Sequence, residues 1–429
     1  MIMIKKSLIL CLFLSLLSFS AGCNRQVELR LGIFVGSNWD VPASETYTFI
    51  DRVIQRYEAS HPGVHVIYES GIRKVDYSNQ LMNDFLSGTE PDVFLIPDDD
   101  FVTLSSLGGL SKLDGRMSRD GIDPTMFYTS AYNAGLYDGN CYALPVESDA
   151  TMMFVNKTLL EAAGIRMPDN EWTLDNFLSI CQQITSDSDG DGKLDVFGCY
   201  NYTWLDSAYG YGVDLFDVNG TKCTLNTNEV RSAIQFIQKL QSLNGGYQVT
   251  GNMFDQGQVA FAPMSFAQYR TYKPYPWRVK KYSSFEWDCV EMPGADEDTN
   301  ASMVSTLLAG ISSRSIHQKE AWEFLKELTC SLDTQRDIMQ YSQGLSVLRE
   351  VLSDADTMDS LSLDMGDTMI DPQVLNDVME NGVCRDVFIK QEDALSLITS
   401  EIDTLIRNDG DIDLQLIRIQ KEVNRYLNQ

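Results

Sequence analysis

Histidine is scarce in this chain of 429 residues, which contains only His61, His65 and His317. The first two flank the start of an expected strand, and the third falls in the first turn of an expected helix, so all three have positions typical of surface or packing residues. The sequence also lacks a nucleophile elbow, a zinc-binding histidine pair and a glycine-rich phosphate loop. These absences remove the usual signs of catalysis, and we expect a protein that is not an enzyme.

Basic residues are also few, because 33 lysines and arginines face 61 aspartates and glutamates, for a net charge of −28. Such a chain repels phosphate backbones, which makes nucleic acid a poor partner. With 44% hydrophobic residues and no long low-complexity tract, the sequence is typical of a folded globular protein and not of a disordered acidic one. Its length allows two or more domains.

Long apolar runs are absent except at the N-terminus, where residues 8–19 form one short run. Lys5 and Lys6 precede this run, and the small residues 20–22 follow it. A basic start, a short apolar core and small residues are typical of a secretory signal peptide, which we assign to residues 1–22. The run is too short to cross about 30 Å of hydrocarbon as a permanent helix.

Cys23 follows the small residues directly, and this arrangement resembles the lipobox of bacterial lipoproteins, although Ser20 stands where that motif usually has leucine. The resemblance implies that Cys23 is acylated and becomes the N-terminus, with residues 23–28 as a short tether. We therefore expect an exported protein anchored to the outer face of the cell membrane. Ordinary secretion with an unmodified Cys23 is the alternative.

Cysteines are scattered, and an odd number of them follows Cys23. These seven cysteines are Cys141, Cys181, Cys199, Cys223, Cys289, Cys330 and Cys384. An odd number leaves at least one unpaired. We expect buried free thiols and not a disulfide framework, while a bridge between Cys181 and Cys199 stays open.

The first part of the mature chain alternates strands and helices. Apolar runs at 29–35, 64–68 and 92–96 predict strands, and helical spacing of apolar residues predicts helices at 45–63 and 77–88. Strand-helix-strand-helix-strand with short joints predicts a parallel, doubly wound α/β sheet. Ligands on such sheets bind outside the carboxyl ends of the strands.

The same kind of pattern restarts beyond Cys141. Short apolar strands alternate there with amphipathic helices, such as those expected at 172–185 and 228–243. Two further amphipathic stretches, 393–408 and 414–427, lie near the C-terminus. Two α/β lobes with a small closing helical region fit this organisation best.

The stretch SDSDGDGKLD resembles the first part of a calcium-binding loop. Asp187, Asp189 and Asp191 offer alternate ligands, and Asp195 would bind directly or through water. The twelfth position, where the motif requires a bidentate glutamate, is Gly198. Without that acid and without a second helix, a sensor role is not expected. The loop is either a weak structural calcium site or a solvated hairpin, and no cofactor is required.

The order of several segments resembles the extracellular solute-binding proteins of ABC importers, in the sugar-binding branch that includes maltose-binding protein. The matching segments are SHPGVHVIYESG, LMNDFLSGTEPDVFLIPDDD, YALPVESDATMMFVNKTLLEAAGI, EWTLDNFLSICQQIT, DSDGDGKLDVFG, FDQGQVAF and LLAGISSRSIHQKEAWEFLKEL. No single segment is decisive, whereas their order and spacing over roughly 300 residues are.

The resemblance implies a fold of two doubly wound α/β lobes joined by a multi-crossing hinge, like a type II periplasmic binding protein. It implies that the chain crosses between lobes near Ala143, Met303 and Leu345. The first lobe would then comprise 29–143 plus 303–345. The second would comprise 144–302 plus 346–429, including the C-terminal helices.

Sugars offer hydroxyls, which carboxylates and amides bind, and flat C–H faces, which aromatic rings cover. The expected ligand-binding residues are acids and aromatic residues near strand ends or in loops. They are Trp39, Asp99, Asp149, Tyr202, Trp204, Tyr211, Phe266 and Trp277. Asp99 and Asp149 match acidic sugar contacts of the family, although Asp99 lies in a run that also suits a solvated turn, and Glu147 competes closely with Asp149.

The aromatic cluster around Trp204 is mixed with glycines and Asn201, which favours a ligand-contacting loop over a helix face. Phe266 stands near the position where the family usually has a stacking tryptophan, and Trp277 either replaces that ring or packs on the surface. The predicted function is capture of a mono- or oligosaccharide by a monomer and its delivery to an ABC permease. A non-sugar solute (peptide, polyol phosphate or osmolyte) or a carbohydrate-cleaving enzyme are the alternatives.

Overall fold

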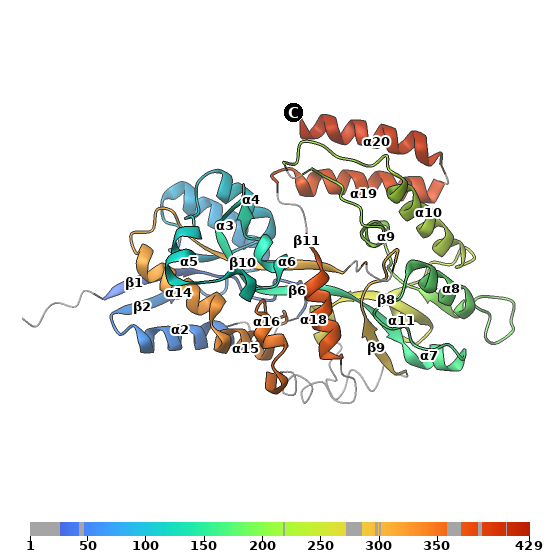
Figure 1. Ribbon diagram of the computed structural model, residues 1–429, viewed down its shortest axis with the longest axis horizontal. Helices are drawn as coiled ribbons and strands as arrows, with labels where there is room; N and C mark the ends of the chain where they lie inside the picture. Colours follow the sequence, from blue (N-terminus) through green and yellow to red (C-terminus); the bar gives the residue numbers. More distant parts are fainter. Residues whose placement is uncertain are drawn as a thin grey trace, which may run out of the picture.

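The protein is a mixed α/β structure in which one large sheet continues through two lobes (Figure 1). The computed structural model describes residues 26–42, 47–217, 219–271, 285–296, 299, 302–357, 370–384, 388–408 and 410–429, without the side chains of residues 98, 99 and 271. No helix in these ranges is both long enough and apolar enough to cross a membrane. The expected signal peptide and Cys23 lie outside the described residues.

The first lobe begins with three parallel strands, β1 (Val27–Gly32), β2 (Val64–Tyr68) and β3 (Val93–Ile96). The helices α2 (Thr48–Ser60) and α3 (Lys74–Ser87) connect them, as their apolar spacing predicts. Helix α3 ends at Gly88, which has φ of 71°, a left-handed conformation that glycine adopts without strain. The strand and helix pattern expected for this part of the chain is confirmed.

The remaining first-lobe helices surround these strands. They are α4 (Asp98–Ser106), α5 (Asp114–Asp120), the 3₁₀ helix η2 (Pro124–Met126), α6 (Thr129–Asn133), α14 (Gln318–Cys330), α15 (Leu332–Tyr341), α16 (Arg349–Leu352) and α18 (Pro372–Asn381). A small hairpin of β4 (Leu136–Tyr137) and β5 (Asn140–Cys141) leads to the next strand.

Two antiparallel strands make the sheet mixed and not purely parallel. β10 (Met303–Ile311) lies between β3 and the long strand β6 (Ala143–Asn156), antiparallel to both. The chain returns from the second lobe through β10, so this strand runs in the direction opposite to β1, β2 and β3. The sheet order is β2-β1-β3-β10-β6-β8-β7, with β11 (Val383–Cys384) on β10 and β9 (Trp287–Val290) on β6.

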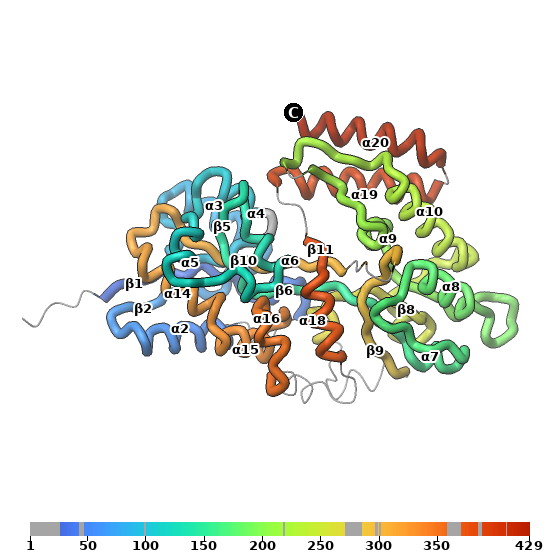
Figure 2. Tube along the Cα trace, viewed as in Figure 1, coloured from blue at the N-terminus to red at the C-terminus, as the bar shows by residue number. Residues whose placement is uncertain are grey.

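The second lobe continues the sheet with β8 (Val259–Ser265) and β7 (Phe197–Cys199). Figure 2 shows the helices α8, α9, α10, α19 and α20 gathered around this end of the molecule. The helices of this lobe are α7 (Lys157–Ala162), α8 (Leu174–Ile184), α9 (Trp204–Gly210), α10 (Asn228–Ser242), α11 (Gly251–Asp255), α12 (Phe266–Thr271), α19 (Gln391–Asn408) and α20 (Ile412–Leu427).

The residues around Trp204 form helix α9, so the loop predicted there is wrong. Thr203 and Asp206 form a capping box, in which the Thr203 side chain accepts from the Asp206 backbone N–H and Asp206 accepts from the Thr203 N–H. This reciprocal pairing satisfies two donors that a helix start leaves open. The T-x-x-D spacing was present in the sequence, but the neighbouring glycines obscured it.

The buried side chains form two clusters, of which the larger extends along the sheet from the first lobe into the second and the other lies within the second lobe. Helices α19 and α20 pack into the second cluster, through residues such as Ile402 and Leu416. Helix α18 differs, because it packs beside α6 and α16 of the first lobe, with Leu375 and Val378 buried in the larger cluster. The grouping of 346–429 with the second lobe therefore does not describe α18, whose apolar face is buried against the first lobe.

Candidate ligand-binding site

Strand β6 joins the two lobes and carries the two acids expected near the hinge. Its first part pairs with β10, down to Ala150 opposite Val304. Its second part pairs with β8, starting at Thr151 opposite Ser265. Glu147 and Asp149 therefore lie just before the point where the partner strand changes, and only 3% and 7% of their surfaces are exposed.

Glu147 is a buried carboxyl group that takes part in contacts with the segment following α15. The Ser342 hydroxyl donates a hydrogen bond to its Oε2, and the Gly344 backbone also interacts with it. Burial raises the pKa of Glu147 to about 7, although the bonds from Ser342 and Gly344 and the charge of Arg270 act in the opposite direction. This group therefore exchanges a proton near neutral pH.

Trp39 lies beside Glu147, in the loop that follows β1. A Cβ atom added at Gly344 would stand 2.7 Å from Glu147 Oε2 and 3.0 Å from Trp39 Nε1, so the carboxylate and the indole nitrogen meet at this glycine. The Trp39 Nε1 is buried and has no hydrogen-bond partner among the described residues. An indole N–H donor at the carboxyl end of a parallel strand is well placed for a ligand hydroxyl.

A cavity of about 30 Å³ lies in the same region, at the carboxyl ends of β1 and β3. Its walls come from the loop after β1, from α2, from β6 and β10 and from the end of α15. They are Ile33, Phe34, Gly36, Ser37, Asn38, Phe49, Ile50, Leu95, Glu147, Leu307, Tyr341, Ser342 and Gln343. This volume accommodates about one or two water molecules, so a sugar would need the surrounding segments to move apart.

Asp149 faces the second lobe. Its Oδ1 accepts hydrogen bonds from the backbone N–H groups of Ala150, at 3.0 Å, and Ala267, at 2.9 Å. Burial raises the pKa of Asp149 to about 6, against the lowering effect of these bonds and of the Ser265 side chain. Asp149 thus holds the start of α12 onto the lobe-crossing strand.

Arg270, on α12, links the second lobe to the first. Its Nη1 donates to the carbonyl oxygen of Met339, at 2.8 Å, and its Nη2 reaches the carbonyl of Gln340, at 3.4 Å. The guanidinium also lies 5.9 Å from the centre of the Phe266 ring. These contacts tie α12 to the C-terminal end of α15, whose next residues lead to Ser342 and Gly344.

The structure brings some predicted site residues together and separates others. Trp39 lies with Glu147, and Phe266 lies beside Asp149 and Arg270 but is fully buried against Tyr269. The side chain of Asp99 and the whole of Trp277 lie outside the described residues. Their assignment to the ligand site stays a prediction.

The aromatic cluster of the second lobe lies in its core. Trp204 and Tyr202 have 1% and 7% of their surfaces exposed, and Tyr202 packs edge-on against Phe177. Tyr211 ends helix α9 and packs against the same core. The Tyr202 hydroxyl and the Trp204 indole nitrogen are buried with no hydrogen-bond partner among the described residues, and both rings belong to the apolar cluster within the second lobe.

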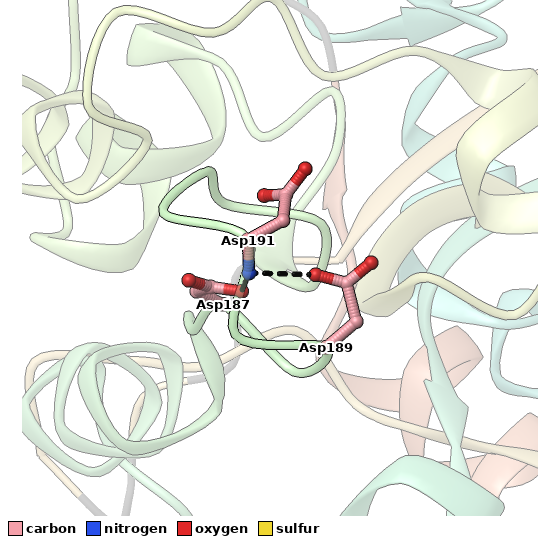
Figure 3. A group of neighbouring side chains, drawn as sticks. All are labelled: Asp187, Asp189 and Asp191. Carbon is pink, nitrogen blue, oxygen red and sulfur yellow. Dashed lines mark hydrogen bonds between the residues drawn. The ribbon is translucent and has the colours of Figure 1, made fainter.

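The aspartate loop is exposed, and its carboxylates accept hydrogen bonds largely from groups of the same loop (Figure 3). Oxygens of Asp187, Asp189 and Asp191 all lie within 4.8 Å of one another, which is compatible with shared coordination of a cation. In addition, Asp187 accepts from the backbone N–H groups of Gly190 and Gly192, both at 2.7 Å. Asp195 instead accepts from the Ser188 N–H and hydroxyl, both at 2.8 Å. Three of the four predicted ligands are therefore gathered, and Asp195 is engaged elsewhere.

Sequence reasoning missed Ser342, Gly344 and Arg270. Ser342 lies 195 residues from Glu147 and Arg270 lies 69 residues from Met339, and nothing in their local sequence distinguishes them from ordinary turn or helix residues. The only local signal is the S-Q-G stretch directly after an amphipathic helix, which indicates a turn but not what it contacts.

Similarity to solved structures supports this architecture. The chain superimposes on a sugar-binding protein, MalE, from Xanthomonas citri with a TM-score of 0.76 and 16% identity, covering 94% of this chain and 98% of that one. The cyclic alpha-maltosyl-1,6-maltose binding protein from Arthrobacter globiformis superimposes with a TM-score of 0.76 and 18% identity, covering 94% of this chain and 99% of that one. An ABC substrate-binding protein from Listeria monocytogenes in complex with cycloalternan superimposes with a TM-score of 0.69 and 18% identity, again covering 94% of this chain and 99% of that one.

Sequence comparisons point in the same direction. A protein of Brucella abortus strain 2308 named as a binding protein is 25% identical over 186 residues, which are 42% of this chain. The match spans 43% of that relative's length, less than half of it. Residues 42–329 match the family described as bacterial extracellular solute-binding protein. Because this match covers most of the chain and both lobes share the fold of such proteins, the protein belongs to the bacterial extracellular solute-binding protein family.

Proposed function

We propose that the protein captures a mono- or oligosaccharide outside the cell and delivers it to an ABC permease. The observation that carries this proposal is the meeting of the Glu147 carboxylate and the unpartnered Trp39 indole N–H beside a cavity at the carboxyl end of β1. A carboxylate accepts hydrogen bonds from sugar hydroxyls, and an indole offers both an N–H donor and a flat face for C–H groups.

Capture would proceed by closure of the two lobes around the ligand. β6 passes through both lobes, and Arg270 and Asp149 connect α12 of the second lobe to α15 and β6. A ligand that contacts both lobes stabilises the closed form by its differential affinity for the two forms. The second lobe must then move away from the loop of Trp39 and the segment of Ser342 and Gly344 to admit the ligand.

The remaining parts of the proposal concern location and partner. The signal peptide followed by Cys23 supports export and acylation, which would keep the receptor near its permease in the membrane. The names of several structural neighbours refer to sugars, which supports a carbohydrate over other solutes. We further propose that the protein acts as a monomer and needs no cofactor.

A thermal-shift screen of mono- and oligosaccharides, followed by calorimetric titration, tests the ligand class. A saccharide at about 100 times its Kd would stabilise the fold by about 2.7 kcal/mol and raise its melting temperature clearly. Trp39→Phe, which keeps a ring but loses the N–H, should weaken binding about tenfold. Trp287→Phe, on β9 and packed on Phe154, is the matched control and should bind normally.

Two outcomes would replace the sugar assignment. Stabilisation by a peptide, a polyol phosphate or an osmolyte, but by no saccharide, would leave the fold and the receptor role and change the ligand. Turnover of a glycoside that disappears in Asp149→Ala would indicate a carbohydrate-cleaving enzyme instead.

A further inference from the structure

The end of the first lobe that is remote from the cavity carries an unusual concentration of exposed apolar side chains. The most exposed large apolar residues in the described part of the chain are Ile316, Leu86 and Leu107, at 88%, 86% and 79%. Leu86 lies in the last turn of α3, whereas Leu107 and Ile316 lie in the connections that follow α4 and β10. Single exposed apolar residues are ordinary, but three on one end of a molecule mark an interaction surface.

Hydrogen bonds show that these three segments lie together. The Arg314 Nη2 donates to the Phe85 carbonyl at 2.6 Å, which joins the segment of Ile316 to that of Leu86. The Ser313 hydroxyl donates to the Gly108 carbonyl at 2.7 Å, which joins it to that of Leu107.

The N-terminal end of β1 belongs to the same surface. The Arg30 Nη1 donates to the Thr89 carbonyl at 2.7 Å, directly after α3. β1 is parallel to β3, with Leu31 opposite Val93, so Val27 extends four residues beyond the start of β3, or about 13 Å. We name this end the outer pole and define it as residues 27–30, 85–90, 107–109 and 313–316.

The charges of the outer pole differ from those of the chain as a whole. Arg30 and Arg314 are exposed there, and the Glu90 carboxylate that pairs with Arg314 at 2.7 Å has only 5% of its side chain exposed. Glu28 adds one exposed carboxylate. In a protein of net charge −28, a surface whose two arginines balance its two carboxylates is repelled little by lipid phosphates, and its exposed Leu and Ile side chains suit the interface of a bilayer.

The length of chain before β1 identifies the occupant of this surface. Only three residues separate Cys23 from Val27, so the two are at most about 14 Å apart. If Cys23 is acylated, the outer pole is held at the bilayer surface and cannot swing far from it. This step rests on the lipid anchor of the proposed function, whereas the exposed residues and their contacts do not.

We propose that the outer pole of the first lobe rests on the lipid bilayer, with Leu86, Leu107 and Ile316 inserted into its interface. This orientation points the carboxyl ends of β1 and β3, with Trp39 and the cavity, away from the membrane. Three apolar side chains bury little surface compared with a membrane-spanning helix, so the contact is weak and reversible. The receptor can then leave this position to dock on a permease, turning about its short tether.

Photo-crosslinking to lipid tests the contact directly. Leu86, Leu107 or Ile316 is replaced by p-benzoylphenylalanine in the full-length, membrane-processed chain, which is reconstituted into phosphatidylcholine vesicles and irradiated. Leu414 and Ile417, exposed by 63% and 53% on α20 of the second lobe, are the matched control positions. Phospholipid adducts should form several-fold more often at the outer pole than at the controls.

A second preparation separates this proposal from the lipid anchor. Residues 24–429 carrying an N-terminal hexahistidine tag are bound to vesicles that contain nickel-chelating lipid, and the same positions are irradiated. If the full-length chain proves not to be acylated by mass spectrometry but the tagged chain gives adducts at the outer pole, the anchor fails and the contact stands.

Equal adduct yields at the outer pole and at the controls would overturn the contact, even with Cys23 acylated and sugar binding intact. Adducts to a second copy of the chain, with none to lipid, would overturn it as well. The triple variant Leu86→Asp, Leu107→Asp and Ile316→Asp gives an independent check. Its melting temperature should stay unchanged, while exchange protection of segments 85–90 and 313–316 on vesicles, measured by hydrogen-deuterium exchange, should be lost.

Discussion

The two acid-rich regions of this protein behave differently, although the sequence offers both as candidate sites. The aspartate loop packs Asp187, Asp189 and Asp191 into five residues, but they lie on the surface and are held by backbone N–H groups of their own loop. Glu147 and Asp149 are only two acids on a strand, yet both are buried and both have a raised pKa. Burial, and not the density of acids along the chain, decides which carboxyl groups have unusual chemistry.

The largest effect of this difference is expected in the pH dependence of the free energy of unfolding. The folded-state pKa of Glu147 is raised from 4.5 to about 7, so its contribution is fully present below about pH 4.5 and is lost as the pH rises through 7. In Glu147→Gln the decrease in unfolding free energy between pH 5 and pH 8 should shrink by up to about 3 kcal/mol. Urea denaturation at the two pH values measures this.

Asp195 provides the control in the other region. Hydrogen bonds from Ser188 lower its pKa, so its contribution is present above the unfolded pKa of 3.8 and is lost only as the pH falls below it. Asp195→Asn should therefore leave the change between pH 5 and pH 8 as in the wild type. An equal response of the Glu147 and Asp195 variants would contradict the distinction between the two regions.

The second test compares how much one acid from each region contributes to the free energy of unfolding. At pH 5, where Asp149 is largely protonated, Asp149→Ala leaves the backbone N–H groups of Ala150 and Ala267 without an acceptor and should lower the unfolding free energy by about 1–3 kcal/mol. Asp189→Ala removes one exposed acceptor and should change it by less than about 0.5 kcal/mol. Denaturant melts of both variants give the two values.

Asp149→Asn refines this comparison, because the amide oxygen can still accept the same two bonds. It should restore most of the stability lost in Asp149→Ala. If it does not, the loss comes from packing and not from the unpaired N–H groups.

The smallest effect is expected from calcium. We expect the loop to bind calcium weakly, since Asp195 is engaged with Ser188 and Gly198 stands at the twelfth position. At about ten times its Kd, calcium would stabilise the fold by roughly 1.4 kcal/mol. Melting temperatures with calcium and with a chelator measure the shift, which Asp187→Asn should abolish and Glu147→Gln should not. No shift at millimolar calcium would make the loop a solvated hairpin.

The local pattern of apolar residues was sufficient to predict most of the first lobe. Helix α2 and strand β2 lie where apolar spacing and the Pro62–Gly63 stop place them, and Gly88 ends α3. The same kind of local signal, a T-x-x-D capping box at Thr203, existed for α9 but was outweighed by glycines nearby. Capping and periodicity are short-range effects, so a sequence can reveal them.

The candidate site was predictable only in part. Asp149 and Trp39 follow from strand ends and from family resemblance, and both lie near the lobe crossing or the cavity. Trp204 has equally polar neighbours in the sequence, yet it packs in the core of the second lobe. A tryptophan in a polar stretch can line a ligand site or pack in the core, and which of the two occurs depends on the distant elements that cover it.

Short-range order thus came from the chain itself: alternation of strands and helices, their caps, and the export signal expected at residues 1–22. Three-dimensional packing decided the rest. It placed Gly344 and Ser342 against Glu147, about 195 residues away, and it raised the pKa of that acid by excluding water. Helix periods repeat every few residues and are visible in one segment, whereas burial is set by the joint positions of segments far apart in the chain.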